Sequence, residues 1–468
     1  MLKFLDEVFR NFRSCFSRTA AFEWFVVIVI GLMIRSDHLG ITSVIRDLWL
    51  NSDYVTMMGF FRSTAWSLEG LIQQWCQTVL RYAPLIYMDD RMILIGDGMK
   101  QTKEGRRMPG VKRLHQESEN SGKPSYMYGH MFGAIGILAG VRNKQFCIPL
   151  AIQIQDGVKT ILGWQENPER QGSHVEEMIR LACNVIRYTG KSAILLLDRY
   201  FLSVKALQQA AAGNIHIITK AKSSCVAYED PVFRQGARGR PPKKGAPVKL
   251  IMLFETEDHL FKEAQALLYG KQVAIRYHLI DLLWGQKLYQ RLRFVLVWYD
   301  GLKSIMVSTD LSLDPVRIVE LYAKRFRIET TFRELHQVVN AFSYRFWSKH
   351  MPKLKRYRKK NEPDPLDSIT GEKERKRIGL ALRATEVSVF CASVAMGLLQ
   401  MISLHFSGTS ELSKCRYQRT YRSDYWSEDA VADYLSKNIY RLLVNHPHLS
   451  ITRFIWSRQY DIYEQNTA

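Results

Sequence analysis

The sequence has few cysteines, and none of them forms a metal-binding type of pair. Its seven cysteines include no C-x-x-C motif, and their number is odd. Structural zinc sites need closely spaced ligand pairs, and disulfide frameworks need an even set of cysteines in an oxidising compartment. The sequence therefore argues against a structural zinc site and against a disulfide framework, and we expect a protein of the reducing cytoplasm.

Long uninterrupted hydrophobic runs are also missing. The run from Trp24 to Ile34 has 11 residues, whereas a membrane-spanning helix needs about 20. The longer stretch Val387–Phe406 is diluted by polar residues. Near the N-terminus, Asp6 and Glu7 interrupt the layout of a secretory signal. Both apolar runs are therefore predicted to be helices of a buried core, and no membrane partner is expected.

Acidic residues are the third deficit. The chain has 45 Asp and Glu against 66 Lys and Arg, which gives a net charge of +21 and a pI near 9.6. A surplus of this size favours a polyanionic partner, and DNA, RNA and an acidic membrane surface all qualify. A generally basic soluble surface has the same composition, so charge alone leaves the partner open.

The 468 residues are expected to form several substructures, because a single core rarely grows beyond about 300 residues. Residues 1–85 have apolar residues at helical spacing and scattered arginines, which fits a DNA-binding domain or a helical cap equally well. The predicted organisation continues with a core (86–220 and 301–345), a β-rich insertion (221–300), and a basic loop followed by a C-terminal helical region (346–468).

Apolar runs bounded by turn residues predict the strands of the core. These runs are Met92–Gly96, Tyr128–Leu138, Phe146–Ile154, Ala193–Leu197 and Ile215–Thr219. Helices are predicted after Ser173, where Glu176 completes a capping box, and at 203–212. Three strands followed by alternating helix and strand are typical of a mixed sheet with helices packed on it. We therefore predict an α/β fold with a mixed sheet flanked by helices.

The second half of the chain has a different order of predicted elements. Strand-like runs in and after the insertion are Val248–Phe254, Gln272–Leu283, Leu288–Trp298 and Lys303–Ser308, the last of which we expect to return to the main sheet. A helix is predicted from Pro315 to about Val339, and residues 349–377 are predicted to be a mobile basic loop.

Two aspartates follow apolar runs and are candidate ligands of a divalent metal. Asp97 ends Ile-Leu-Ile-Gly-Asp, and Asp198 ends Leu-Leu-Leu-Asp. A carboxylate at the end of a buried strand is rigidly placed at the sheet edge, and Mg²⁺ prefers such oxygen ligands. A turn or a helix cap uses the same residue type. Asp89 and Asp90 compete for the first position, and Asp156, followed by glycine, competes for the second.

A third carboxylate lies in the helix predicted around LYAKRFRIETTFRELHQ (321–337). Tyr322, Arg325, Glu329 and His336 are spaced to lie on nearly one face of this helix. A face that presents a carboxylate beside cations suits metal-assisted cleavage of phosphodiesters, in which two cations activate the attacking oxygen and stabilise the leaving oxygen. A charged surface helix with incidental ion pairs remains the alternative.

These residues resemble the signature of the IS4-type DDE transposases, in which Tyr, Arg, Glu and Lys follow one another at spacings of two, three and six residues. Here the motif is Tyr322, Arg325, Glu329 and His336, so His replaces the family's Lys. The neighbourhoods Ile-Gly-Asp97-Gly-Met-Lys and Leu-Asp198-Arg-Tyr-Phe are also similar. The aromatic-rich segment from Gly59 to Trp66 adds to the likeness, which covers roughly residues 20–345.

The resemblance implies an RNase H-like core with Asp97, Asp198 and Glu329 as catalytic, metal-binding residues. It implies two Mg²⁺ ions, with Mn²⁺ as a substitute. The implied reaction is hydrolysis at transposon ends followed by attack of the freed 3′-hydroxyl on target DNA. The implied partners are double-stranded DNA and a second copy of the chain. Tyr322 and Arg325 would contact DNA, and Arg333 or a protonated His336 would replace the family's Lys at phosphate.

One loop matches the core of a minor-groove hook. Arg238 and Arg240 flank a glycine in Arg-Gly-Arg-Pro, and arginines of such hooks enter narrow AT-rich grooves. A solvated connection or a general backbone contact has the same sequence. Two further readings of the whole chain stay open: a catalytically decayed DNA-binding regulator of this fold, and an RNase H-like nuclease that cuts without joining.

Overall fold

A computed structural model describes residues 1–35, 37, 40–51, 54–116, 122, 124–141, 144–164, 170, 172–232, 240–356, 362–407 and 426–459. The chain divides into two compact units. Unit 1 comprises Met1–Leu85, Gly98–Glu177 and Thr330–Ala468, and unit 2 comprises Ile86–Asp97 and Met178–Glu329. Three elements continue from one unit into the other: β2 (Arg91–Thr102), α7 (His174–Thr189) and α11 (Arg327–Gln337).

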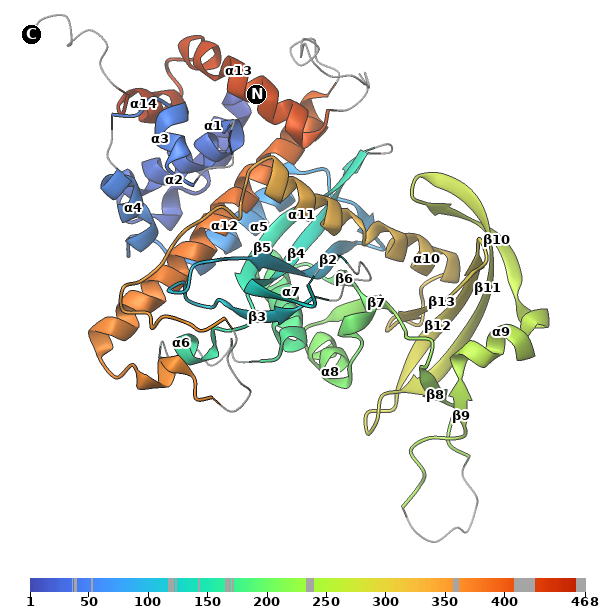
Figure 1. Cartoon of the computed structure of the whole chain (residues 1–468). Coiled ribbons are helices and arrows are strands. Elements are labelled where there is room, and N and C mark those ends of the chain that lie inside the picture. Colours follow the sequence, from blue (N-terminus) through green and yellow to red (C-terminus); the bar gives the residue numbers. More distant parts are fainter. Residues whose placement is uncertain are drawn as a thin grey trace, which may run out of the picture. The chain divides into compact units, whose positions relative to one another are not determined.

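Unit 1 is mainly helical. Its helices come from both ends of the chain: α1 (Leu2–Arg10), η1 (Arg13–Cys15), α2 (Thr19–Ile34), α3 (Ser43–Asp47), α4 (Tyr54–Arg62), α5 (Leu68–Tyr82), α6 (Lys159–Trp164), η6 (Pro365–Ser368), α12 (Glu372–Phe406), α13 (Glu428–Val444) and α14 (Ser450–Trp456). Its strands are β3 (Lys112–His115), β4 (Tyr126–Val141) and β5 (Lys144–Ile154), which pair antiparallel around β4. Figure 1 shows the blue N-terminal helices beside the orange and red C-terminal ones.

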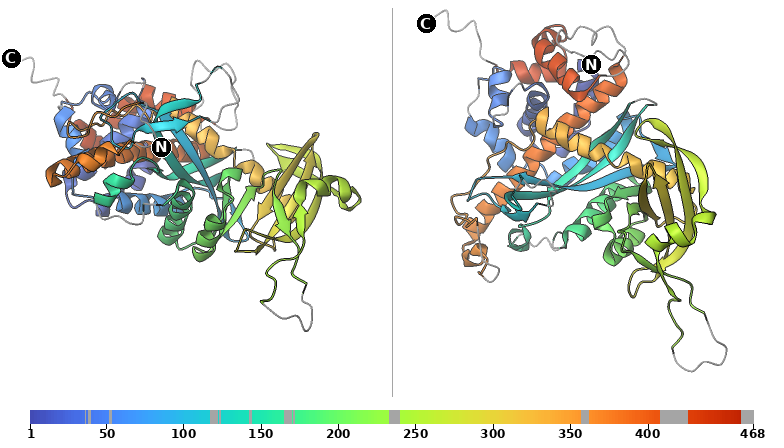
Figure 2. Two further views of the ribbon diagram at one scale, coloured as in Figure 1. Left: turned by 60° about the horizontal axis from the view of Figure 1, so that its bottom comes forward. Right: turned by 45° about the vertical axis from the view of Figure 1, so that its right-hand side comes forward.

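The long helix α12 is the centre of unit 1. It packs against β5, α2, α4, α5 and α13, and both views in Figure 2 show the helices of the two chain ends gathered along it. By length and composition α12 could cross a membrane, but its apolar window is 94% buried inside the protein. The prediction that Val387–Phe406 and Trp24–Ile34 are buried core helices is confirmed, because α2 is also buried along its apolar length.

Unit 2 contains the parallel part of the sheet. Strand β6 (Ala193–Leu197) lies between the start of β2 and β7 (Ile215–Lys220) and is parallel to both. All five residues of β6 are buried, as expected for a strand covered on both faces. The helix α8 (Val204–Ala212) begins at Ser203, whose side chain accepts a hydrogen bond from the Ala206 amide, and it packs on β7. A short β1 (Tyr87–Met88) forms a hairpin with β2.

Antiparallel strands extend this sheet beyond β7. The order from β7 is β13 (Leu302–Ser308), β12 (Gln290–Tyr299), β11 (Lys271–Trp284), β8 (Val226–Tyr228) and β9 (Pro247–Lys249), and β10 (Lys262–Leu268) also pairs with β11. The remaining elements of unit 2 are η3 (Arg199–Phe201), η4 (Leu250–Met252), α9 (Leu253–Thr256), η5 (Asp258–Leu260) and α10 (Pro315–Lys324). The predicted return of Lys303–Ser308 to the main sheet is confirmed by the pairing of β13 with β7.

The mixed sheet with flanking helices confirms the predicted α/β class, but three local predictions were wrong. The expected strand Val248–Phe254 is strand only up to Lys249, and η4 and α9 follow it. The expected loop 349–377 ends early, because α12 begins at Glu372. The single helix expected from Pro315 to Val339 is two helices, α10 and α11, separated by a turn at Arg325 and Phe326.

Candidate active site

The parallel pairing of β2 and β6 brings Asp97 and Asp198 together. The register pairs Met92 with Ala193 and ends with Gly96 opposite Leu197, so the next residues along the two strands are the two aspartates. Neighbouring strands are about 4.8 Å apart. The pairing therefore places both carboxylates at adjacent positions of the same sheet.

The predicted strand end is confirmed for Asp198 but not for Asp97. Strand β6 stops at Leu197, and Asp198 begins η3, where its carbonyl accepts hydrogen bonds from the Thr219 hydroxyl and the Phe201 amide, both at 3.0 Å. Strand β2 continues through Asp97 to Thr102, so the prediction of a strand end at Asp97 was wrong. The apolar run did end there, but the polar residues that follow it remain paired as strand.

The competing aspartates have structural positions elsewhere. Asp89 and Asp90 both have positive φ angles and form the two-residue turn between β1 and β2, a conformation that Asp tolerates in hairpins of this length. They lie at the start of β2, seven or more residues before Asp97. Asp156 lies in a bend between β5 and α6, where Gly157 has a positive φ angle, and it accepts hydrogen bonds from the Gly157 amide and, at 2.9 Å, from Lys112.

Arg325 links two of the three predicted carboxylates. Its Nη1 donates to Asp97 Oδ2 at 3.0 Å, and its Nη2 donates to Glu329 Oε1 at 2.7 Å. Arg325 is the residue after α10, and its backbone angles remain in the right-handed helical region. The hydrogen-bond ladder is interrupted there, yet the i to i+4 spacing of Arg325 and Glu329 is preserved.

Burial and the nearby carboxylates together shift the pKa values of Arg325 and Tyr322. Burial by itself would lower the pKa of the Arg325 guanidinium, but Asp97, Tyr322, Glu329 and Asp198 together raise it. Burial raises the pKa of the Tyr322 phenol to about 12, and Asp198 adds to the rise while Arg325 opposes it. Arg325 is therefore a permanent cation in unit 2 that lies near Asp97, Glu329, Tyr322 and Asp198.

The chemistry of these donors suits a hard divalent cation, because carboxylate oxygens are the ligands that Mg²⁺ prefers. Asp97 and Asp198 fit this requirement as a pair on adjacent strands. The arrangement of the third ligand differs from a closed site, since the Arg325 guanidinium lies between Asp97 and Glu329. Within the described parts of the chain, no three His, Cys, Asp or Glu side chains are grouped closely enough to hold a metal ion.

The remaining predicted DNA-binding residues lie on α11 and in the insertion. Arg333 is exposed, and both its Nε and its Nη2 donate to Glu334. His336 is exposed in the last turn of α11, with its ring 6.4 Å from that of Phe342. Arg240 is exposed in the loop before β9. Arg238 lies outside the described residues.

The sequence prediction missed a group of basic side chains in unit 1. Arg106 and Arg345 line one cavity, and Trp347, which is 62% exposed, lines it as well. The available signal was the basic run Lys103–Arg107 together with an aromatic residue beside Arg345. These residues are about 240 positions apart in the sequence, so no local pattern joins them.

The central parallel strands, the antiparallel extension and the flanking helices define the class: a mixed α/β protein with an RNase H-like sheet that carries adjacent carboxylates. Residues 11–276 match the family described as DDE superfamily endonuclease. The match covers more than half of the chain, and the chain belongs to this family. No curated protein matches the sequence.

Family membership makes the protein a nuclease of the transposase kind that acts on DNA and agrees with the predicted reaction class. Nucleases of this family generally depend on divalent metal ions. The matched range includes Asp97 and Asp198 and ends within β11, so Glu329 lies beyond it.

Proposed function

We propose that this chain is a transposase of the IS4 type that cleaves DNA at transposon ends and transfers the freed 3′ ends to target DNA. The observation that carries the proposal is the register of β2 and β6, which sets Asp97 beside Asp198 in a chain of the DDE endonuclease family. The helix motif Tyr322, Arg325 and Glu329 adds the third carboxylate of the same cluster. The enzyme is proposed to act in the cytoplasm, at the nucleoid, as a homodimer on paired DNA ends.

Asp97, Asp198 and Glu329 are the proposed ligands of two Mg²⁺ ions, which Mn²⁺ would replace. Bound cations would activate the attacking oxygen and stabilise charge on the leaving oxygen. In the protein itself, Asp198 is fixed through its carbonyl by Thr219, and Asp97 is fixed within β2. Arg325 holds Asp97 and Glu329 by charge. A metal ion would compete with its guanidinium for these carboxylates, and a DNA phosphate would compete with the carboxylates for the guanidinium.

The proposal is tested by incubating the protein with linear DNA that carries its element's terminal repeats, with Mg²⁺ or with EDTA. Mg²⁺-dependent cleavage and joining to a target plasmid support a transposase. Cleavage without joining supports a nuclease that only cuts. Binding without cleavage at any divalent metal supports a decayed regulator, a reading that the direct contacts of Arg325 to two of the three carboxylates keep open.

Removing the Arg325 cation from beside the carboxylates should make the stability of the protein depend more on divalent metal. In Arg325→Gln the two ion pairs are lost and Asp97, Asp198 and Glu329 repel one another, so we expect the metal-free protein to lose about 1 kcal/mol of stability. The shift of the melting midpoint produced by Mn²⁺ should be larger than in the wild type. Arg317→Gln, which removes the exposed pair with Glu320 on α10, is the matched control. An equal or smaller Mn²⁺ shift in Arg325→Gln would contradict the proposed role.

Restoring the family's lysine should not impair the enzyme. His336 is exposed on α11, so His336→Lys meets no steric obstacle and supplies a charge at every neutral pH. We expect cleavage at pH 7.5 equal to the wild type or up to about tenfold faster. Initial cleavage rates of both proteins on the same end-labelled duplex provide the check. A folded His336→Lys protein that cannot cleave would sink this prediction.

A further inference from the structure

Unit 1 has a surface where an exposed tryptophan stands between two hollows that are lined by cations. One cavity, of about 910 Å³, has five basic side chains and one carboxylate, Glu104, in its lining; the basic residues are Lys103, Arg106, Arg107, Arg345 and Lys353. A second cavity, of about 740 Å³, has five basic side chains and no carboxylate; the basic residues are Arg62, Arg345, Lys349, Lys373 and Arg377. Trp347 lines both cavities, and we call these residues together the Trp347 surface.

The backbone beneath this surface is held firmly. The amides of Ser348 and Leu354 donate to the carbonyls of Arg107 and Arg106, at 3.2 and 2.9 Å. Arg107 Nη1 donates to the carbonyls of Lys349 and Met351. The segment that carries Trp347 is therefore hydrogen-bonded to the loop after β2, and these bonds fix the backbone from which its side chains extend.

Several cations of the surface have no acidic partner. No ion pair joins Arg106, Arg345 or Lys353 to a carboxylate anywhere in the described ranges. Burial and the charge of Arg345 lower the pKa of Lys103 to about 8, as expected where positive charge is concentrated. A surface of this kind attracts a polyanion, because Glu104 is the one carboxylate against the basic side chains that line the two cavities.

The exposed ring of Trp347 suits a ligand that has a flat aromatic group as well as phosphates. Trp347 is 62% exposed, and in the described structure it has no aromatic or cationic partner over its ring. The comparably exposed Trp49 is different, because its ring packs 5.2 Å from that of Tyr440. A flat apolar ring between cations suits a strand whose phosphates meet the cations and whose unpaired base stacks on the ring.

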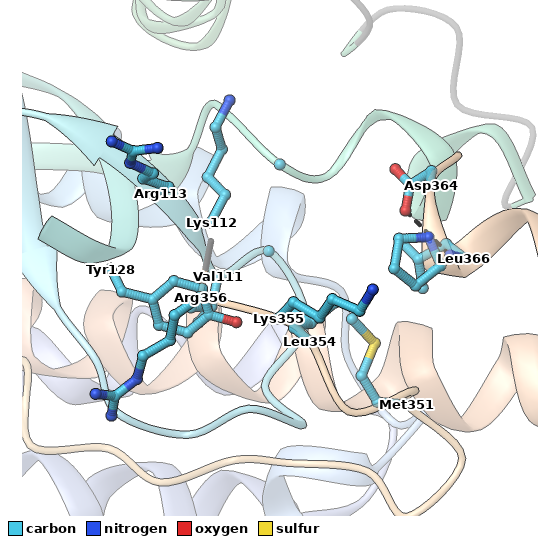
Figure 3. Close-up of a pocket in the computed structure, with 13 residues that line it drawn as sticks. Val111, Lys112, Arg113, Tyr128, Met351, Leu354, Lys355, Arg356, Asp364 and Leu366 are labelled. Atoms are coloured by element: carbon cyan, nitrogen blue, oxygen red, sulfur yellow. Dashed lines mark hydrogen bonds between the residues drawn. The ribbon is translucent and has the colours of Figure 1, made fainter. Parts of the chain in front are cut away.

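The cationic lining continues beyond the first cavity. Figure 3 shows a further pocket, of about 310 Å³, whose lining includes the cations Lys112, Arg113, Lys355 and Arg356 together with Tyr128 and the carboxylate Asp364. Burial raises the pKa of Tyr128 to about 12, while the charges of Arg106 and Arg356 oppose that rise, so Tyr128 lies between cations of both cavities. Its hydroxyl is buried and has no hydrogen-bond partner among the described residues.

We infer that the Trp347 surface binds a single-stranded segment of DNA, with phosphates on Arg106, Arg345 and Lys353 and an unpaired base stacked on Trp347. This inference rests on the proposed action on DNA and adds the form of DNA that one surface selects. Duplex DNA offers phosphates to the same cations but no free base face to the ring.

The test measures binding by fluorescence anisotropy in EDTA, with a labelled oligodeoxythymidylate and a blunt duplex of the same length. Trp347→Ala should weaken binding of the single strand by about 5- to 100-fold and binding of the duplex by less than about twofold. Trp347→Phe, which keeps an aromatic face, should retain most of the single-strand affinity. Trp49→Ala, at a similar exposure, should leave both affinities unchanged.

A charge variant tests the other half of the inference. Arg345→Gln should reduce the slope of log affinity against log salt for the single strand by about 0.7, which is the value for one phosphate contact. The inference is overturned if Trp347→Ala binds the single strand as the wild type does, if it loses single strand and duplex equally, or if Trp347→Phe is as weak as Trp347→Ala. Because no divalent metal is present, failure of the proposed cleavage reaction would not alter these results.

Discussion

Asp198→Asn and Asp97→Asn are each expected to reduce Mg²⁺-dependent cleavage by at least about 1000-fold. Asn keeps the size of the side chain but removes the charge, and the loss of one metal ligand removes several kcal/mol of transition-state stabilisation, at about 1.4 kcal/mol for each factor of ten. Initial rates of cleavage of an end-labelled duplex provide the measurement. Binding of the same duplex in EDTA should be retained by both variants, since neither changes the cationic surfaces.

Asp90→Asn is the matched control for these two variants. Asp90 competes with Asp97 on sequence grounds, but it is exposed in the turn before β2 with a positive φ angle that Asn also adopts readily. We expect its cleavage rate to stay within about twofold of the wild type. Equal losses in Asp90→Asn and Asp97→Asn would mean that the register of β2 and β6 does not define the site.

The largest effect on stability is expected at a buried ion pair of unit 1. Arg170 donates two hydrogen bonds to Glu386, at 2.6 and 3.1 Å, and one to the Ile154 carbonyl, while Glu386 also accepts from the Ile154 amide. Both side chains are buried, at 11% and 5% exposure. Glu386→Gln removes only the negative charge and leaves the guanidinium unpaired, which should cost about 3–5 kcal/mol.

Urea unfolding followed by tryptophan fluorescence measures this loss. Lys437→Gln, which breaks the exposed pair with Asp433 on α13, should cost less than about 1 kcal/mol and serves as the comparison. Glu386→Leu should recover part of the loss only if Arg170 is replaced at the same time. A Glu386→Gln protein as stable as Lys437→Gln would show that the pair is solvated in solution.

Local sequence determined the elements that carry the candidate site. The buried run Ala193–Leu197 has to be a covered strand because all five side chains are apolar, and this fixes Asp198 at its end. Ser173 and Glu176 form the predicted capping box, in which each side chain bonds the other residue's amide. Where the local signal was mixed the prediction failed, as at Asp97, because strand pairing with neighbours carried β2 past the end of its apolar run.

The break between α10 and α11 is a second place where local sequence did not predict the structure. The residues around Arg325 have good helical spacing, and nothing in their sequence marks a turn. Only in the folded chain does Arg325 hold Asp97, 228 positions away in the sequence, as well as Glu329 in the next helical turn. The pair with Glu329 is the i to i+4 contact that helical spacing predicts, whereas the pair with Asp97 is a tertiary contact about which helical periodicity gave no information.

The sequence by itself determined the α/β class, the buried apolar strands and helices, the basic charge and three carboxylates with suitable chemistry. These properties depend on residue type and short-range spacing, which act before any long-range contact forms. Only the tertiary structure decided which distant side chains meet: Asp97 with Asp198 through parallel pairing, Arg325 with Asp97, and Trp347 with the cations of the loop after β2. Each of these contacts joins residues about 100 to 240 positions apart, so its formation depends on the packing of the whole chain and not on local sequence.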